Sequence, residues 1–257
     1  MIQGIDHLVV VINDLDQAIR DYRELGFTVV AGGQHPVGSH NALIAFEDGS
    51  YLEIIAFYRE ARDHRWWEPL RKGERFVDFC FQTDDLPGDT QKLRDAGVAI
   101  NDPVPWARKR PDGYELKWLL SLVTGSQRGV APFLIQDLTL RSERVPQAFE
   151  HPNRVTGIET VTVAAPEIGS VEKWYDSLLR TTARSITSGD LHAEGLCFNV
   201  GPHVMEFLAP REPSSPLVNW LRQFGPSPYS AVLKAKNATP KLLLDARLTH
   251  GAQLFIR

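Results

Sequence analysis

An internal repeat constrains the fold of this 257-residue chain more strongly than any other feature. Three landmarks in the second half lie 153 residues after their counterparts in the first half, with no net gap between them. The matched landmarks are Gly4-Ile5-Asp6-His7 and Gly157-Ile158-Glu159-Thr160, Tyr22 and Tyr175, and Glu53 and Glu206. Because a constant spacing is typical of a duplicated structural unit, the sequence predicts two copies of one architecture.

The first copy divides into two modules of the order β-α-β-β-β. In the first module we expect strands over residues 5–12, 27–30, 41–46 and 51–57 and a helix over 15–25. In the second module we expect strands over 76–83, 98–100, 115–122 and 130–136, a helix from residue 84, and a basic loop with a Pro-Asp-Gly turn over 108–114. Aspartates favour helix starts and glycines favour helix ends, which places both helices.

The second copy is shorter than the first. After a polar linker over 137–153 comes a complete third module, and the fourth module has only a strand over 229–236, a helix over 240–248 and a strand over 253–257. The sequence therefore predicts an α+β fold with units at 1–137 and 154–257 and a truncated fourth module. An open sheet edge there favours pairing with another chain, so we expect a homodimer.

Composition limits the partners of the protein. Hydrophobic residues make up 43% and charged residues 23%, and a net charge of −4 gives no general attraction to nucleic acid or an anionic membrane. Cys80 and Cys197 lie in apolar runs and are expected to be reduced core residues. The sequence shows neither a signal peptide nor a stretch apolar enough to span a membrane, so we expect a cytoplasmic protein.

His7 and Glu53 are ionisable residues within apolar strands. A buried carboxylate without a partner is costly, so one explanation is that both side chains converge on a metal ion or a polar ligand. The alternative is that Glu53 faces solvent or an arginine and that His7 is a hydrogen-bonded core histidine.

Asp78 occupies the position of His7 in the second module, because each residue precedes the aspartate of a helix start by seven positions. Strand alternation places Asp78 and Cys80 on one face, and Val77 and Phe79 on the other. The alternative to a ligand role is an ion pair between Asp78 and an arginine such as Arg108.

The repeated modules, the opening DHLVVVINDLDQAIRDY and the strand GSYLEII resemble the vicinal oxygen chelate superfamily, which includes glyoxalase I, extradiol dioxygenases and bleomycin-resistance proteins. The stretch GQHPVGSHNALIAFEDGSYLEIIAF is typical of its glyoxalase-like domain branch. The resemblance implies that paired modules form curved mixed sheets around a cleft. It also implies a substrate that chelates a divalent metal through adjacent oxygens.

The resemblance further implies His7, Glu53 and Asp78 as metal ligands, whereas Phe133 stands at the fourth ligand position and cannot bind a metal. One nitrogen and two carboxylates suit Mn²⁺, Fe²⁺, Mg²⁺ or Zn²⁺, and they also fit a protein that has lost the metal and keeps the cleft. Thr160 replaces His7 in the second half, so we expect only the first half to be active.

Four further residues are candidate substrate contacts. His35, His40 and Asn41 lie in or near the loop before the third strand, and Trp118 can form a wall of the cleft. Turn formation around Gly38 and core packing of Trp118 are the alternatives.

Two classes of function fit these residues. The first is a metal-dependent lyase, isomerase or dioxygenase that acts on a small oxygen-rich molecule, with Glu53 or Asp78 moving a proton. The second is a metal-free protein that binds or sequesters a small molecule. A collapsed cleft in a dimerisation module is a third alternative, because the fold alone does not decide function.

Overall fold

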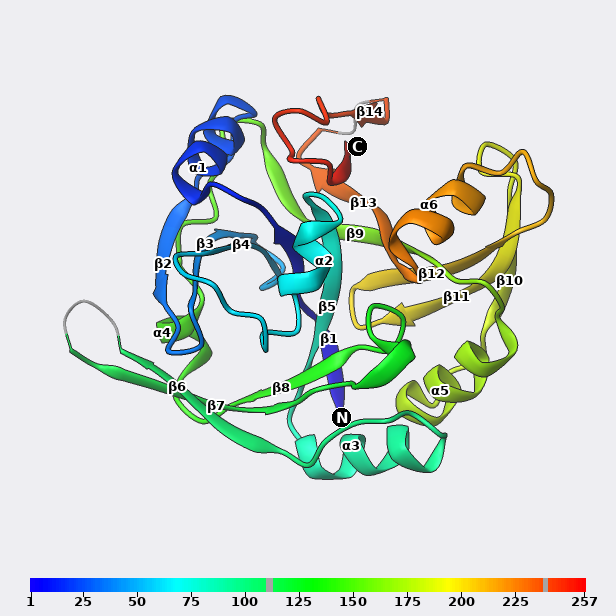
Figure 1. Cartoon of the computed structure of the whole chain (residues 1–257), viewed down its shortest axis with the longest axis horizontal. Helices are drawn as coiled ribbons and strands as arrows, with labels where there is room; N and C mark the ends of the chain where they lie inside the picture. Colours follow the sequence, from blue (N-terminus) through cyan, green and yellow to red (C-terminus); the bar gives the residue numbers. More distant parts are fainter. Residues whose placement is uncertain (110–112, 238–239) are drawn as a thin grey trace.

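Two β-sheets, one from each half of the chain, pack face to face (Figure 1). The structure, a computed structural model, describes residues 1–109, 113–237 and 240–257. The predicted Pro-Asp-Gly turn includes residues 111 and 112 and therefore lies outside the described residues.

Among the described residues, the first half contains eight strands, four short or medium-length α-helices and one 3₁₀ turn. These elements are β1 (Ile2–Val11), α1 (Leu15–Glu24), β2 (Val30–Gln34), β3 (Ser39–Ala45), β4 (Tyr51–Phe57), α2 (Trp67–Arg71), β5 (Arg75–Thr83), α3 (Leu86–Asp95), β6 (Val104–Lys109), β7 (Glu115–Ser121), η1 (Gly125–Gln127), β8 (Phe133–Asp137) and α4 (Arg141–Arg144).

The second half contains seven strands and two helices among the described residues. They are β9 (Val155–Ala164), α5 (Gly169–Leu179), β10 (Arg184–Ser188), β11 (Ala193–Val200), β12 (His203–Pro210), α6 (Pro216–Phe224), β13 (Ser227–Ala235), β14 (Leu242–Leu243) and β15 (Gln253–Ile256). No helix in the described part of the chain has the length and apolar character that a membrane span requires.

Each module forms half of a sheet, and the first strands of paired modules meet at its centre. The strand orders are β2-β3-β4-β1-β5-β8-β7-β6 and β10-β11-β12-β9-β13-β15-β14. Within each module the first and last strands are parallel, as β1 and β4 are, whereas β1 and β5 are antiparallel. This arrangement confirms the predicted α+β fold of paired β-α-β-β-β modules.

Strand register shows which residues of the two modules of the first half are equivalent. In the antiparallel pair β1 and β5, His7 lies opposite Cys80, and Val9 lies opposite Asp78. A two-fold rotation that exchanges the two strands therefore places His7 on Asp78 and Val9 on Cys80. Val9 also lies beside Glu53, as Cys80 lies beside Phe133. Asp78 and Phe133 therefore stand where the first module has His7 and Glu53.

The alternation predicted for β5 is wrong at Val77. Val77 packs with Cys80 in the core on the outer side of the sheet, whereas Phe76 and Phe79 pack between the sheets. A register shift opposite Val9 and Val10 marks a β-bulge, and the extra residue reverses the alternation there.

The fourth module differs from the prediction. Residues 240–248 form the short strand β14 and turns instead of a helix. The Asp245 side chain accepts a hydrogen bond from the backbone N–H of Arg247 at 2.9 Å, a local bond that competes with helix formation. β15 lies parallel to β13, the place that β8 takes beside β5. Among the described residues this module therefore lacks a helix and one strand, whereas the sequence predicts that its last two strands are missing.

Two predicted strands are displaced. β2 begins at Val30, the last residue of the predicted range 27–30, and β6 begins at Val104, after the predicted range 98–100. Both strands extend into the predicted loops. Gly32 lies at a register shift in β2, which indicates a bulge in an edge strand. Glycine there is a strand residue, although it resembles a loop signal in the sequence.

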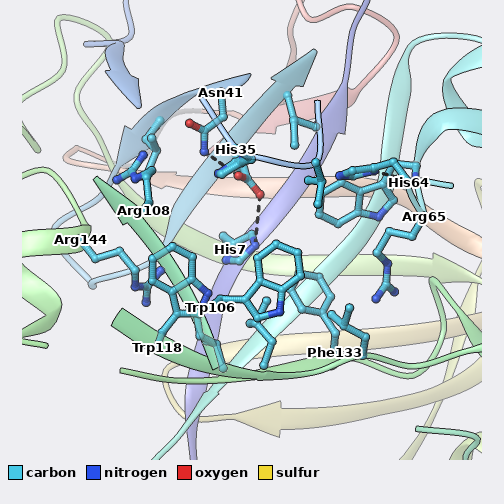
Figure 2. Close-up of a pocket in the computed structure, with 18 of the residues that line it drawn as sticks. His7, His35, Asn41, His64, Arg65, Trp106, Arg108, Trp118, Phe133 and Arg144 are labelled. Atoms are coloured by element: carbon cyan, nitrogen blue, oxygen red, sulfur yellow. Dashed lines mark hydrogen bonds and ion pairs between the residues drawn. The ribbon is translucent and has the colours of Figure 1, made fainter. Parts of the chain in front are cut away.

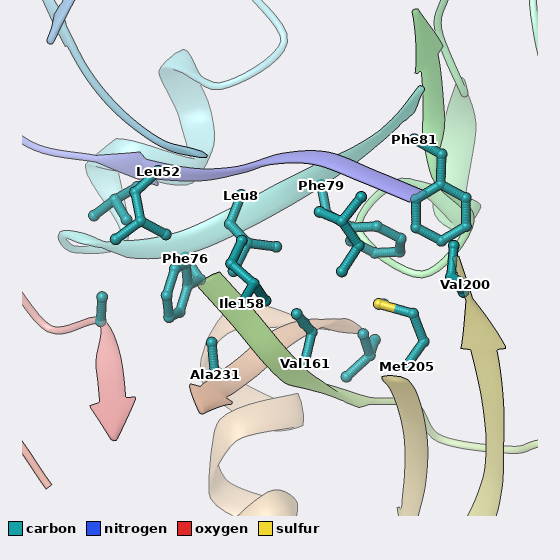
Figure 3. Packing of buried hydrophobic residues seen from close by; sticks show 14 of the residues in the cluster. Leu8, Leu52, Phe76, Phe79, Phe81, Ile158, Val161, Val200, Met205 and Ala231 are labelled. Carbon is teal, nitrogen blue, oxygen red and sulfur yellow. The ribbon is translucent and has the colours of Figure 1, made fainter. Parts of the chain in front are cut away.

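One hydrophobic core joins the two halves. Leu8, Phe79 and Phe81 from the first sheet face Val161 and Met205 from the second (Figure 3). The helices α1, α3 and α5 add their apolar faces to the same core.

The two repeated tyrosines form reciprocal bonds across this core. The Tyr22 hydroxyl donates to the Thr249 carbonyl at 3.0 Å, and the Tyr175 hydroxyl donates to the Val130 carbonyl at 2.8 Å. Each half thus satisfies a buried hydroxyl with a backbone carbonyl of the other half. The predicted homodimer stays a prediction, with β10 and β14 as the edges of the second sheet.

Candidate functional site

A cavity of about 770 Å³, partly open to solvent, lies on the outer face of the first sheet. Its lining includes five of the predicted site residues, namely His7, His35, Asn41, Glu53 and Trp118 (Figure 2). These side chains come from β1, β3, β4, β7 and the loop before β3.

A chain of three ionisable side chains forms the floor of the cavity. The Nδ1 atom of His7 lies 2.7 Å from Oδ1 of Asp6, and its Nε2 atom lies 3.4 Å from Oε2 of Glu53. His7 is 4% exposed and Glu53 8% exposed, so both work in a largely dry environment. The ring of Tyr51 stacks on His7 with centroids 4.6 Å apart and fixes its plane.

A β-bulge explains how neighbouring residues in β1 can contact each other. Successive side chains in a regular strand point to opposite faces, which would separate Asp6 from His7. The register of β1 against β5 shifts between Ile5 and His7, so Asp6 is the extra residue of a bulge. This local kink brings the Asp6 carboxylate to the His7 ring.

Arginines from the linker after β8 neutralise Asp6. Arg144 donates from Nη2 to Asp6 at 2.8 Å, and Arg141 donates to the same carboxylate. Burial alone would raise the pKa of Asp6, but the two guanidinium groups outweigh it and hold this pKa well below its usual range. Asp6 therefore stays a carboxylate and keeps a proton on Nδ1 of His7.

Arg144 also connects Asp6 to other parts of the module. It donates from Nη2 to Asp137 at 2.9 Å and from Nη1 to the Tyr51 hydroxyl at 2.9 Å. Burial and the nearby Asp6 raise the pKa of Tyr51 well above its ordinary value, so this hydroxyl stays protonated.

Asn41 orients the carboxylate of Glu53. Its Nδ2 donates to Oε1 of Glu53 at 2.7 Å, and its Oδ1 accepts from the backbone N–H of Gly33 at 3.0 Å. A Cβ atom at Gly32 would meet Asn41 Oδ1 at 2.0 Å, so glycine there makes room for the amide. With one oxygen bound to Asn41, Glu53 directs the other toward His7.

The imidazoles of His35 and His64 also line the cavity, and both are neutral. Burial, with smaller contributions from His35 and Arg65, lowers the pKa of His64 to about 4. Burial also lowers the pKa of His35, despite the opposing effect of Glu53. The imidazoles of His35 and His64 are therefore uncharged at neutral pH.

Aromatic side chains form the remaining walls. Trp106 and Trp118 lie opposite each other on β6 and β7, and Trp66 comes from the connector before β5. The Phe133 ring meets His7 edge-on at 5.3 Å. Arg65 and Arg108 add positive charge to these walls.

Two predicted residues do not line the cavity. The Asp78 carboxylate accepts from Nη2 of Arg65 at 2.6 Å and from the indole N–H of Trp66 at 3.0 Å. The expected alternative of an ion pair thus holds for Asp78, with Arg65 in place of Arg108. The His40 ring lies edge-on to Tyr58, outside the cavity lining.

The sequence profile of the glyoxalase-like domain matches residues 5–179. The chain belongs to the glyoxalase-like domain family. It is therefore a member of the vicinal oxygen chelate superfamily, as the sequence motifs predict. No curated protein matches the chain by sequence.

Solved structures share the fold of this glyoxalase-like protein. A hypothetical protein from Staphylococcus aureus matches with a TM-score of 0.73 and 17% identity over 98% of each chain. A variant of 4-hydroxymandelate synthase from Streptomyces coelicolor matches with a TM-score of 0.65 and 15% identity over 92% of this chain and 72% of the other. A fusion of a xylose isomerase-like TIM barrel and 4-hydroxyphenylpyruvate dioxygenase matches with a TM-score of 0.54 and 13% identity, over 92% of this chain and 37% of the other.

The predicted ligands His7, Glu53 and Asp78 do not, in the described part of the chain, form a donor set that fits a resident metal. His7 Nε2 and Glu53 Oε2 form one adjacent pair, but Asp78 is bound by Arg65 and Trp66, and Phe133 has no donor atom. Asp6, His7 and Cys80 also lie close together, yet Asp6 is bound by two arginines and burial raises the pKa of the Cys80 thiol. Two donors are fewer than the three that catalytic metal sites usually have.

Sequence reasoning missed Asp6, Arg144, His64 and Trp106. A bulge beside His7 and the fold of a polar linker give no periodic signal that would identify the first two. Besides Trp118, the adjacent Trp66 and Trp67 are a sequence clue to an aromatic wall, and of these two Trp66 lines the cavity.

Proposed function

We propose that the cleft binds a small aromatic acid with adjacent oxygens, and that Glu53 removes a proton from a carbon next to a carbonyl group. The reaction class is isomerisation through an enolate, without a resident metal. The observation that carries the proposal is the chain from Glu53 through His7 to Asp6, with spacings of 3.4 and 2.7 Å.

The hydrogen-bond pattern supports a base at Glu53. Asp6 accepts from Nδ1 of His7, so Nε2 is the nitrogen that can receive a proton from Glu53. In the proposed step the C–H electron pair forms a carbon–carbon double bond, and the carbonyl pair moves onto oxygen. The proton goes to Glu53, is shared with His7, and returns at the same or a neighbouring carbon.

The walls support an aromatic acid as the ligand class. Trp66, Trp106 and Trp118 offer ring faces and edges for a planar group. Arg65, Arg108 and the neutral His35 provide N–H donors for carboxylate and enolate oxygens. The names of two structural neighbours contain 4-hydroxymandelate and 4-hydroxyphenylpyruvate, which belong to this class.

Deuterium exchange tests the proposal with 4-hydroxyphenylpyruvate as the probe. Binding quenches or shifts tryptophan fluorescence, and proton NMR in D₂O follows loss of the methylene signal beyond the buffer rate. We expect Glu53→Gln to slow protein-dependent exchange by roughly 10²- to 10⁴-fold while binding persists.

Glu206→Gln is the matched control, because Glu206 is the counterpart of Glu53 in the second half. Its exchange rate should equal that of the wild type. Saturable binding with no exchange above buffer by the wild type would contradict a base at Glu53 and support a sequestering protein.

A further inference from the structure

A second hollow lies where the two halves meet, between α2 and the connection from α6 to β13. It has a volume of about 870 Å³, including space open to solvent. We call it the seam pocket, defined by Arg65, Trp66, Lys72, Arg75, Arg128 and Phe224. Phe224 comes from the second half, and the other five residues come from the first.

Arg75 is a buried cation without a carboxylate partner among the described residues. It is 3% exposed, and its Nη1 donates to the carbonyls of Pro69 and Gly73, both at 2.6 Å. Its guanidinium lies over the Phe224 ring at 4.3 Å. Burial lowers the pKa of Arg75 to about 10, so it remains charged at neutral pH.

One edge of this guanidinium has no hydrogen-bond partner among the residues that the structure describes. The Nε atom is buried and makes no hydrogen bond within the described residues, and no bond from Nη2 is found there either. Nε and Nη2 together form the edge with which arginine binds carboxylates and phosphates through two parallel bonds. A buried charge left this way is costly, so an anionic partner would stabilise the protein.

Other charges around the seam pocket favour an anion. Arg65, Lys72 and Arg128 line it together with Arg75, against the carboxylates of Glu68 and Asp78. Asp78 is already bound by Arg65 and Trp66. The hollow therefore has an excess of positive charge in a protein whose net charge is −4.

We propose that the seam pocket binds the oxyanion group of a small metabolite, a phosphate or a carboxylate, with Arg75 at its centre and Lys72 and Arg128 at its rim. This site is separate from the floor of the cleft, although Arg65 and Trp66 line both cavities. The site also gives the second half a role, because its Phe224 ring covers the guanidinium that binds the anion.

Calorimetric titration with inorganic phosphate, and separately with succinate, at constant ionic strength tests the proposal and distinguishes the two sources of the oxyanion. We expect saturable binding of at least one probe at one site per chain. Lys72→Ala should weaken binding about 3- to 10-fold, and Arg75→Lys about 10-fold or more because a lysine lacks the two-bond edge.

Arg71→Ala is the matched control, since Arg71 is the last residue of α2 and precedes Lys72, and it is exposed but does not line the seam pocket. Arg71→Ala should change the affinity for the anion less than twofold. Since it removes one positive charge, as Lys72→Ala does, a larger loss in Lys72→Ala is not a general charge effect. Lys72 is exposed, so Lys72→Ala is expected to fold. This variant therefore tests the site even if Arg75→Lys does not fold. Absence of saturable binding of both probes up to about 50 mM, or equal loss in Arg71→Ala and Lys72→Ala, would overturn the proposal.

Discussion

The two halves share one scaffold, but only the first keeps an open outer face. Val11 and Ile55 belong to the outer core of the first sheet, where the cavity lies. Their counterparts 153 residues later, Ala164 and Leu208, are covered by Leu217 and Trp220 of α6. A helix thus occupies in the second half the face that the first half exposes as a cleft.

The connector before the last module of each half makes this difference. In the first half it forms only the five-residue α2, and His64, Arg65 and Trp66 before it line the cavity. In the second half it forms the nine-residue α6, with Ser215 as N-cap and Pro216 at its start. A longer amphipathic helix buries the sheet, whereas a short one leaves a wall around a cavity.

The second half also lacks the ionisable chain that forms the floor of the cavity in the first half. Thr160 stands in place of His7, and the Thr162 hydroxyl donates to Glu206 at 3.0 Å. Glu206 therefore has a local partner and no imidazole beside it. The comparison teaches that apolar alternation is sufficient to keep the scaffold, whereas the proton chain needs a particular set of residues.

The largest expected effect on stability is at Arg144. Arg144→Met removes one of the two arginine partners of buried Asp6 and the nearer partner of half-buried Asp137. Removing one member of a buried ionic network costs up to about 3–5 kcal/mol of unfolding free energy. Urea denaturation followed by circular dichroism measures this loss. Arg247→Met, at an exposed position, is the control and should not change the midpoint measurably. A loss below about 1 kcal/mol for Arg144→Met would show that water replaces the arginine.

A moderate effect on the rate of proton exchange is expected at Asn41. Asn41→Ala removes the hydrogen bond to Glu53 and should slow proton exchange on 4-hydroxyphenylpyruvate about 10-fold, because the carboxylate loses its orientation. The counterpart Glu194 is exposed, so Glu194→Ala should leave exchange unchanged. Equal exchange by wild type and Asn41→Ala would mean that Glu53 does not need this orientation.

The smallest expected effect is the pH dependence contributed by His64. Its pKa is lowered to about 4, so between this value and about 6.5 the unfolded chain binds more protons than the folded one. Stability is then fully present above about 6.5 and falls toward pH 4, by on the order of 1 kcal/mol after allowance for partial exposure. His64→Phe should flatten this part of the stability curve. An unchanged slope would place the responsible groups elsewhere.

Much of the fold could be predicted from the sequence because a duplicated pattern appears at one constant spacing. The equivalence of Asp78 with His7 follows from their equal distance to the aspartate of a helix start, and that of Phe133 with Glu53 is implied by the family resemblance. Strand register confirms both equivalences. The bulges at Asp6 and Val77 could not be predicted, because alternation assumes a regular strand. The helix expected over 240–248 is absent, and Asp245 instead begins a turn in which its side chain accepts from the backbone N–H of Arg247.

The site was predictable only in part. His7, Glu53, Asn41, His35 and Trp118 meet in one cavity, as expected for strands that end at the same cleft. The partners of Asp78 depend on how the connector folds back over β5, and Arg65 and Trp66 carry no motif that signals this. Arg144 reaches Asp6 from 138 positions away, which no local pattern encodes.

The central claim is that Glu53 and His7 move a proton in the cleft without a resident metal. Its most direct test is deuterium exchange into 4-hydroxyphenylpyruvate by the wild-type protein before and after divalent ions are removed with EDTA. The proposed function predicts equal rates in both preparations, and nearly complete loss of protein-dependent exchange in Glu53→Gln. Exchange that disappears on chelation and returns with one equivalent of Mn²⁺ or Zn²⁺ would contradict it, and would make His7 and Glu53 metal ligands.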